Sequence, residues 1–150
     1  MTIRNLEYLF KPRSIAVVGR GKQAGSPDGT VEFNLIEGGF KGPVMPVNPD
    51  RQSVAGVLAY KDIASLPVVP DLAILTTPLE EASPLIGELG ARGTKAALLL
   101  SREILQDHRG DKAALLSQEM QGKYPDEGES LKRKILETAK PFLLRVMGPD

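Results

Sequence analysis

The chain of 150 residues contains no cysteine, no tryptophan and a single histidine. Without cysteine, disulfide bonds, thiolate chemistry and metal–thiolate sites are excluded. One histidine leaves too few ligands for the usual zinc sites, so we predict no metal site. No run of 18 apolar residues occurs, which predicts no membrane-spanning segment. Since the N-terminus also lacks a basic segment followed by an apolar one, we expect a cytoplasmic protein.

Charge of one sign does not predominate either. Lysine and arginine together number 19, as do aspartate and glutamate, and no dense basic cluster is present. Nucleic-acid binding driven by counterion release is therefore disfavoured. A chain of this length is most simply one domain, here residues 1–150, able to bury about 68–70% of its unfolded surface.

What the sequence does contain is a strand-like run that leads into glycines. The apolar run 14–18 is followed by Gly19, Gly21 and Gly25, and then by Ser26-Pro27, which is typical of a helix start. A buried strand, a tight turn and a helix N-terminus in that order form phosphate-binding sites in α/β proteins. The same pattern also fits a strand–helix turn that binds nothing, and both readings stay open.

Apolar runs alternate with helical patterns through the rest of the chain. In Thr77-Pro78-Leu79-Glu80 we predict a capping box at a helix start. Further strands are expected at 44–47, 57–58, 71–76, 95–100 and 142–147, and helices at 5–10, 26–39, 62–65, 78–89, 111–120 and 129–140. This alternation predicts an α/β fold: a Rossmann-like, doubly wound, mostly parallel sheet of five or more strands. Helices should cover both faces, the first strand should be central, and ligand should bind at the carboxyl ends of the strands.

Several segments, in order, resemble the CoA-binding domain of NDP-forming acyl-CoA synthetases, the family of the succinyl-CoA synthetase α-subunit. They are residues 5–19, 34–49, 66–78, 89–97 and 145–149. The resemblance implies a Rossmann-like domain that binds CoA or acyl-CoA, beside an ATP-grasp subunit or domain or an acetyltransferase domain. The family's catalytic histidine belongs to a second domain, so no catalytic residue is assigned and the chain alone is not expected to make acyl-CoA.

By resemblance, the CoA-binding residues fall on four loops. They are Gly19, Arg20, Gly21, Lys22, Gly25 and Ser26; Asn48 and Arg51; Thr76, Thr77 and Pro78; and Ser101. The chain departs from the family at three of these loop positions: Arg20 replaces a small residue, Asp28 a glycine, and Asp50 a lysine. Residues 102–128 match no part of the family and are interpreted as an inserted surface segment.

Two other functions compete with CoA binding. One is a degenerate Rossmann domain with a regulatory or assembly role, favoured by Asp28 and the altered glycine loop. The other is an NAD(P)-binding domain, in which Asp50 would accept the ribose hydroxyls. Asp50 lies 31 residues after Gly19, whereas about 20 is usual, so we interpret it as a turn residue. The sequence does not decide whether the chain forms a homo-oligomer.

Replacing Asp28 by glycine tests the glycine loop. A carboxylate near the CoA phosphates repels them, so Asp28→Gly should tighten CoA binding, with tenfold corresponding to about 1.4 kcal/mol. The same change should destabilise the helix that follows by about 0.3–1 kcal/mol, because an acid is lost from its first turn. Calorimetric titration of both proteins at one salt concentration measures the effect. Equal affinities would contradict it.

Overall fold

The computed structural model describes residues 5–20, 27–100 and 125–148, without the side chains of residues 27, 28 and 125–129. Several sequence predictions lie outside these residues. They are the helix at 111–120, most of the insertion at 102–128, and the site residues Gly21, Lys22, Gly25, Ser26 and Ser101.

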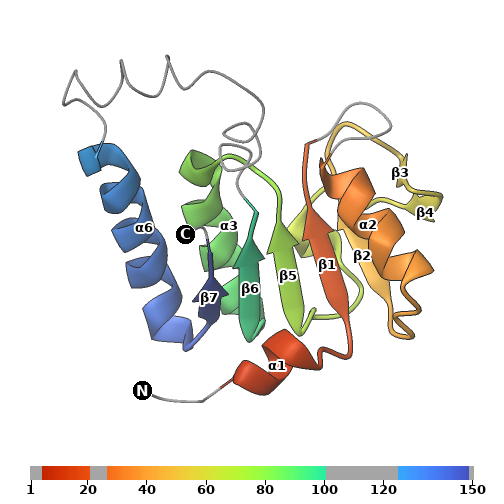
Figure 1. Ribbon diagram of the computed structural model, residues 1–150, viewed down its shortest axis with the longest axis horizontal. Helices are drawn as coiled ribbons and strands as arrows, with labels where there is room; N and C mark the ends of the chain where they lie inside the picture. Colours follow the sequence, from red (N-terminus) through yellow and green to blue (C-terminus); the bar gives the residue numbers. More distant parts are fainter. Residues whose placement is uncertain (1–4, 21–26, 101–124, 149–150) are drawn as a thin grey trace.

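Five parallel strands form one sheet in the order β2-β1-β5-β6-β7 (Figure 1). The strands are β1 (Ile15–Val18), β2 (Val44–Val47), β5 (Leu72–Leu75), β6 (Ala96–Leu99) and β7 (Arg145–Met147). The α/β fold and the parallel sheet are therefore confirmed. β1 is internal, as predicted, but the middle position belongs to β5. All four residues of β1 and of β5 are buried, since both faces of the sheet are covered there.

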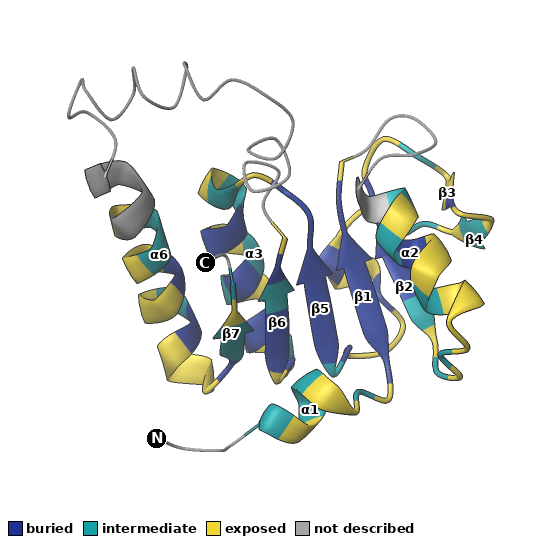
Figure 2. Ribbon diagram, in the orientation of Figure 1, coloured by how far each residue is buried: buried dark blue, intermediate teal, exposed yellow. Residues whose placement is uncertain are grey.

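Helices cover the two faces in separate groups (Figures 1 and 2). α1 (Leu6–Phe10) and α2 (Pro27–Glu37) pack on one face, and α3 (Leu79–Arg92) and α6 (Pro125–Ala139) on the other. The chain steps from β1 to β2 in one direction and from β5 to β7 in the other, so right-handed crossovers place the helices on opposite faces. No helix among the described residues is long and apolar enough to span a membrane.

Three boundaries differ from the predictions. The last strand begins at Arg145 rather than residue 142, because residues before it form the short helix η2 (Lys140–Phe142) and Leu143 has a left-handed φ of 55°. α6 begins at Pro125, ahead of the predicted residue 129. A hairpin of β3 (Ser53–Val54) and β4 (Val57–Leu58) replaces the single predicted strand, with positive φ at both turn residues between them.

Small residues allow α3 to pack closely on α6 and η2. Ser83 Oγ lies 3.0 Å from Thr138 Oγ1, which itself donates to the Lys134 carbonyl at 2.8 Å. A Cβ on Gly87 would lie 3.4 Å from the Thr138 methyl group. A Cβ on Gly90 would lie 2.5 Å from the ring of Phe142. α3 therefore has room for a methyl group at Gly87, where it packs on α6, and no room at Gly90, where it packs on η2.

The short helix η1 (Ile63–Ser65) holds the loop after β4 in place. Asp62 caps it, since its Oδ1 accepts from Ser65 Oγ at 2.6 Å and from Ser65 N at 2.8 Å. The side-chain hydrogen bond, followed by the backbone one, lowers the pKa of Asp62 below its ordinary value of 3.8. Because the folded pKa is below the unfolded one, this stabilisation is present above pH 3.8 and is lost as pH falls through the folded pKa.

Two glycines of α3 should respond oppositely to alanine. Gly87→Ala should keep or raise the free energy of unfolding, because alanine favours a helix over glycine by about 1 kcal/mol and its methyl group fits. Gly90→Ala should lower it by about 1–3 kcal/mol, because the methyl group overlaps the Phe142 ring. Urea denaturation of both variants measures this difference. Equal stabilities would contradict the close contact at Gly90.

Ser65→Ala should raise the pKa of Asp62 toward 3.8 without fully restoring it, because the backbone N–H of residue 65 still donates. The measurement is a pH titration of the side-chain carboxyl carbons by NMR. Ser53→Ala, at an exposed serine in β3, is the control that should leave the Asp62 pKa unchanged. An unchanged pKa in both variants would show that the hydroxyl is not the main cause.

Candidate functional site

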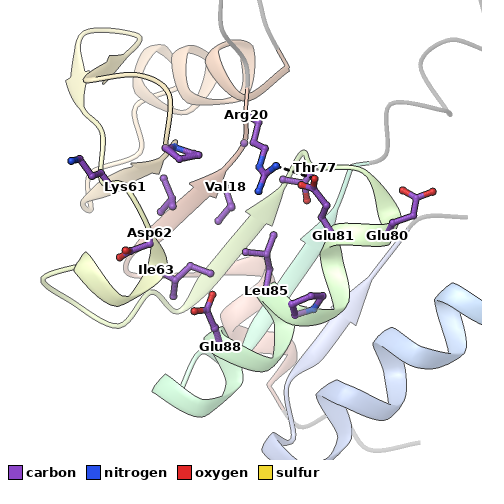
Figure 3. A pocket seen from close by; sticks show the side chains of 14 residues that line it. Val18, Arg20, Lys61, Asp62, Ile63, Thr77, Glu80, Glu81, Leu85 and Glu88 are labelled. Carbon is purple, nitrogen blue, oxygen red and sulfur yellow. Dashed lines mark hydrogen bonds and ion pairs between the residues drawn. The ribbon is translucent and has the colours of Figure 1, made fainter.

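A pocket of about 400 Å³ lies at the carboxyl ends of β1, β2 and β5, on the face covered by α3 (Figure 3). This is the edge of the sheet where the sequence predicts a ligand. The described residues that line it are Val18, Gly19, Arg20, Val47, Pro49, Lys61, Asp62, Ile63, Thr77, Glu80, Glu81, Pro84, Leu85 and Glu88.

The first wall is the end of β1 where it pairs with its neighbours. Gly19 is buried, and its N–H donates to the Val47 carbonyl at 3.0 Å, which extends the β1–β2 pairing by one residue. Thr76 donates two hydrogen bonds to the Val18 carbonyl, one from its backbone N–H at 2.9 Å and one from its hydroxyl at 3.1 Å. The hydroxyl of Thr76 therefore ties β5 to β1 beside the pocket instead of lining it.

The capping box predicted at Thr77 is wrong. α3 begins at Leu79, its N-cap is Pro78, and no side chain caps it. Because the helix starts one residue late, Thr77 stands outside the cap position. Thr77 is 5% exposed and lines the pocket, and its hydroxyl has no hydrogen-bond partner in the part of the chain that the structure describes.

The second wall is built by the chain after β2. Asn48 is fully buried, and its Oδ1 accepts from the backbone N of Asp50 at 2.9 Å. This turn matches our interpretation of Asp50 as a turn residue. The Asn48 N–H donates to the Tyr60 carbonyl at 2.8 Å, and Val47 forms a parallel bridge with Tyr60. The bridge brings residues 61–63 to the pocket beside β2.

The third wall is the first part of α3. Its pocket residues are spaced as one face of a helix, Glu80, Glu81, Pro84, Leu85 and Glu88. Figure 3 shows Glu81, Leu85 and Glu88 on the side of the helix that faces the loop at 61–63, whereas Glu80 points away from that loop. The sequence analysis missed this wall. Its signal is the helical spacing directly after a strand end, which places a helix face beside any ligand at that edge.

The lining combines apolar side chains with an excess of acids. Val18, Val47, Ile63 and Leu85 are apolar, and the acidic residues are Asp62, Glu80, Glu81 and Glu88. Two of the described lining residues, Arg20 and Lys61, are basic. Arg20 Nη1 lies 3.1 Å from Glu81 Oε1. The interior of the pocket therefore suits an uncharged group, and an anion is best accommodated beside Arg20.

Seven of the predicted site residues fall within the described chain. Gly19, Arg20 and Thr77 line the pocket. The other four are not among its lining residues: Asn48, Arg51, Thr76 and Pro78. No three His, Asp or Glu side chains come together as metal ligands within the described ranges.

Comparisons with known proteins agree with this architecture. The chain is 30% identical over 149 residues to the ADP-forming acetate–CoA ligase II of Archaeoglobus fulgidus, covering 99% of this chain and 20% of that protein. It is 26% identical over 150 residues to the α-subunit of ADP-forming acetate–CoA ligase I from Pyrococcus furiosus, covering 97% of this chain and 29% of the subunit. The chain thus spans less than a third of the length of these relatives.

A solved structure, the apo dinucleotide-forming acetyl-coenzyme A synthetase 1 of Candidatus Korarchaeum cryptofilum, superimposes with a TM-score of 0.74 at 28% identity. The match covers 96% of this chain and 27% of that one. The resemblance to the CoA-binding domain of NDP-forming acyl-CoA synthetases is thereby confirmed. Because the family model described as "CoA binding domain" matches residues 13–150, the chain belongs to the CoA-binding domain family.

Proposed function

We propose that this chain binds CoA through its nucleotide half, at the pocket between β1, β2 and α3, and holds it for a partner. The observation that supports this most is the place of the pocket. It opens at the carboxyl ends of the strands, beside Gly19 and Arg20, in a chain of the CoA-binding domain family. The glycine loop that the sequence predicts as a phosphate site continues from the same two residues.

The charges of the pocket favour one orientation of CoA. Adenine is uncharged and carries an amino donor, and the ribose of CoA keeps a free 2′-hydroxyl beside its 3′-phosphate. The adenine and this hydroxyl suit apolar walls and carboxylate acceptors such as Asp62 and Glu88. The phosphates are repelled by the same carboxylates and belong at the rim, beside Arg20 and the start of α2. Gly21, Lys22, Gly25 and Ser26 are proposed to contact the phosphates, with Arg51 on the β2 side of the pocket. The loop at 76–78, through Thr77, and Ser101 are assigned to the path of the pantetheine.

The chemistry is proposed to come from a partner. The A. fulgidus relative is about five times as long as the region it shares with this chain, and the P. furiosus relative is named as an α-subunit. An ATP-grasp domain or subunit fits that organisation, with an acetyltransferase domain as the alternative. Because the acyl group is attached at the end of CoA remote from adenine, the site should accept CoA and acyl-CoA alike.

Calorimetric titration of one sample with CoA, acetyl-CoA, NAD and ATP tests the proposal. We expect CoA and acetyl-CoA to bind with similar affinity, and more tightly than NAD. Tighter binding of NAD would favour the dinucleotide alternative. A folded protein that binds none of the four would favour a degenerate domain, which the acid-rich lining also supports.

Filling the pocket should weaken CoA binding. Leu85 is half-buried and lines the pocket, so the indole of Leu85→Trp should occupy the space proposed for adenine. Leu79→Trp is the matched control, because Leu79 is also half-buried on α3 and packs on the same core without lining the pocket. CoA affinity should fall at least about tenfold in the first variant and stay near wild type in the second.

Since the sequence has no tryptophan, the fluorescence of each variant also reports local folding. Urea denaturation should show both proteins folded before titration. Equal CoA affinity in the Leu85 and Leu79 variants would place the ligand elsewhere.

A further inference from the structure

One ion pair joins the two sides of the pocket mouth. The guanidinium of Arg20, directly after the buried Gly19, extends to the first turn of α3 and contacts Glu81 at 3.1 Å (Figure 3). The two residues are 61 positions apart in the sequence, and both line the pocket. The cation best placed to receive a phosphate is therefore already held by an acid of the same site.

The ion pair is weak enough to be displaced. The side chain of Arg20 is 62% exposed and that of Glu81 is 36% exposed, and pairs exposed to solvent contribute little because water and salt screen them. A phosphate group of CoA carries at least the charge of a carboxylate and offers two oxygens to the planar guanidinium, so it is a stronger partner than one carboxylate oxygen. A phosphate near Arg20 should therefore displace the Glu81 carboxylate from the guanidinium.

After Arg20 has left, the negative charge of Glu81 is still stabilised by the N-terminus of α3. Glu81 lies in the first turn of α3, where the helix dipole stabilises a negative charge. The exchange therefore breaks one solvated contact without leaving an unstabilised charge.

We propose that Glu81 is an affinity-setting residue that competes with a phosphate of CoA for Arg20. This inference rests on the proposed function, because the competing phosphate is that of the CoA nucleotide half. Binding then requires Arg20 to exchange a carboxylate for a phosphate. CoA binds more weakly than it would to an unpaired arginine.

The neighbouring glutamate provides a matched control. Glu80, like Glu81, lies in the first turn of α3 and lines the pocket. No ion pair to Glu80 is found among the described residues, whereas Glu81 pairs with Arg20. Glu81→Gln and Glu80→Gln therefore remove the same charge from the same helix end, and only the first releases Arg20.

The experiment measures CoA affinity by calorimetry at one ionic strength for wild type, Glu81→Gln, Glu80→Gln and Arg20→Gln, and for each glutamine variant combined with Arg20→Gln. Glu81→Gln should tighten CoA binding more than Glu80→Gln, by up to about fivefold, the equivalent of an exposed ion pair of about 1 kcal/mol. Arg20→Gln should weaken binding. In that background the two glutamate variants should differ no longer.

Each alternative result has a separate meaning. Equal effects of the two glutamate variants in the presence of Arg20, or a difference that persists in Arg20→Gln, would overturn the role of Glu81 while leaving CoA binding intact. Absence of CoA binding in all six folded proteins would overturn the proposed function, and the inference with it. Urea denaturation of each variant establishes that it is folded.

Discussion

β1 pairs in parallel with β2 on one side and with β5 on the other, and the position of the site depends on this arrangement. From β1 the chain steps outward through α2 to β2 and later returns past β1 to β5. The helices that follow β1 and β5 therefore lie on opposite faces of the sheet. Between them the carboxyl ends of β1, β2 and β5 are left open, which is where binding sites form in open parallel sheets.

Much of this fold was predictable from short-range signals. The buried strands are continuous apolar runs, and α2 ends within two residues of the predicted end at Gly39, which has a positive φ of 83°. The late start of β7 depends on a contact remote in sequence. Phe142 lies against Gly90 of α3, so the segment before β7 turns into η2 and the strand starts later than its apolar residues suggest.

The site was predicted less completely than the fold. Glycine-rich and threonine-proline loops are visible in the sequence, and they identified Gly19, Arg20 and Thr77. The loop that carries Lys61–Ile63 is positioned by the bridge between Val47 and Tyr60. This pairing was not predicted, because no local sequence pattern indicates it. The late start of α3 was equally hidden, because a threonine–proline pair at a strand end is compatible with two helix starts that differ by one residue.

Different faces of α3 line the pocket and pack on α6. The residues that line the pocket, such as Glu81 and Leu85, occupy one face of the helix, and Ser83 and Gly87 occupy the face that packs on α6. Ile86 and Leu89 fill the core between these two faces. Substitutions on the pocket face thus change the lining of the candidate site without touching the contacts between α3 and α6. The lining of the pocket and the packing of the domain are therefore set by different side chains of one helix, so either can be changed while the other is kept.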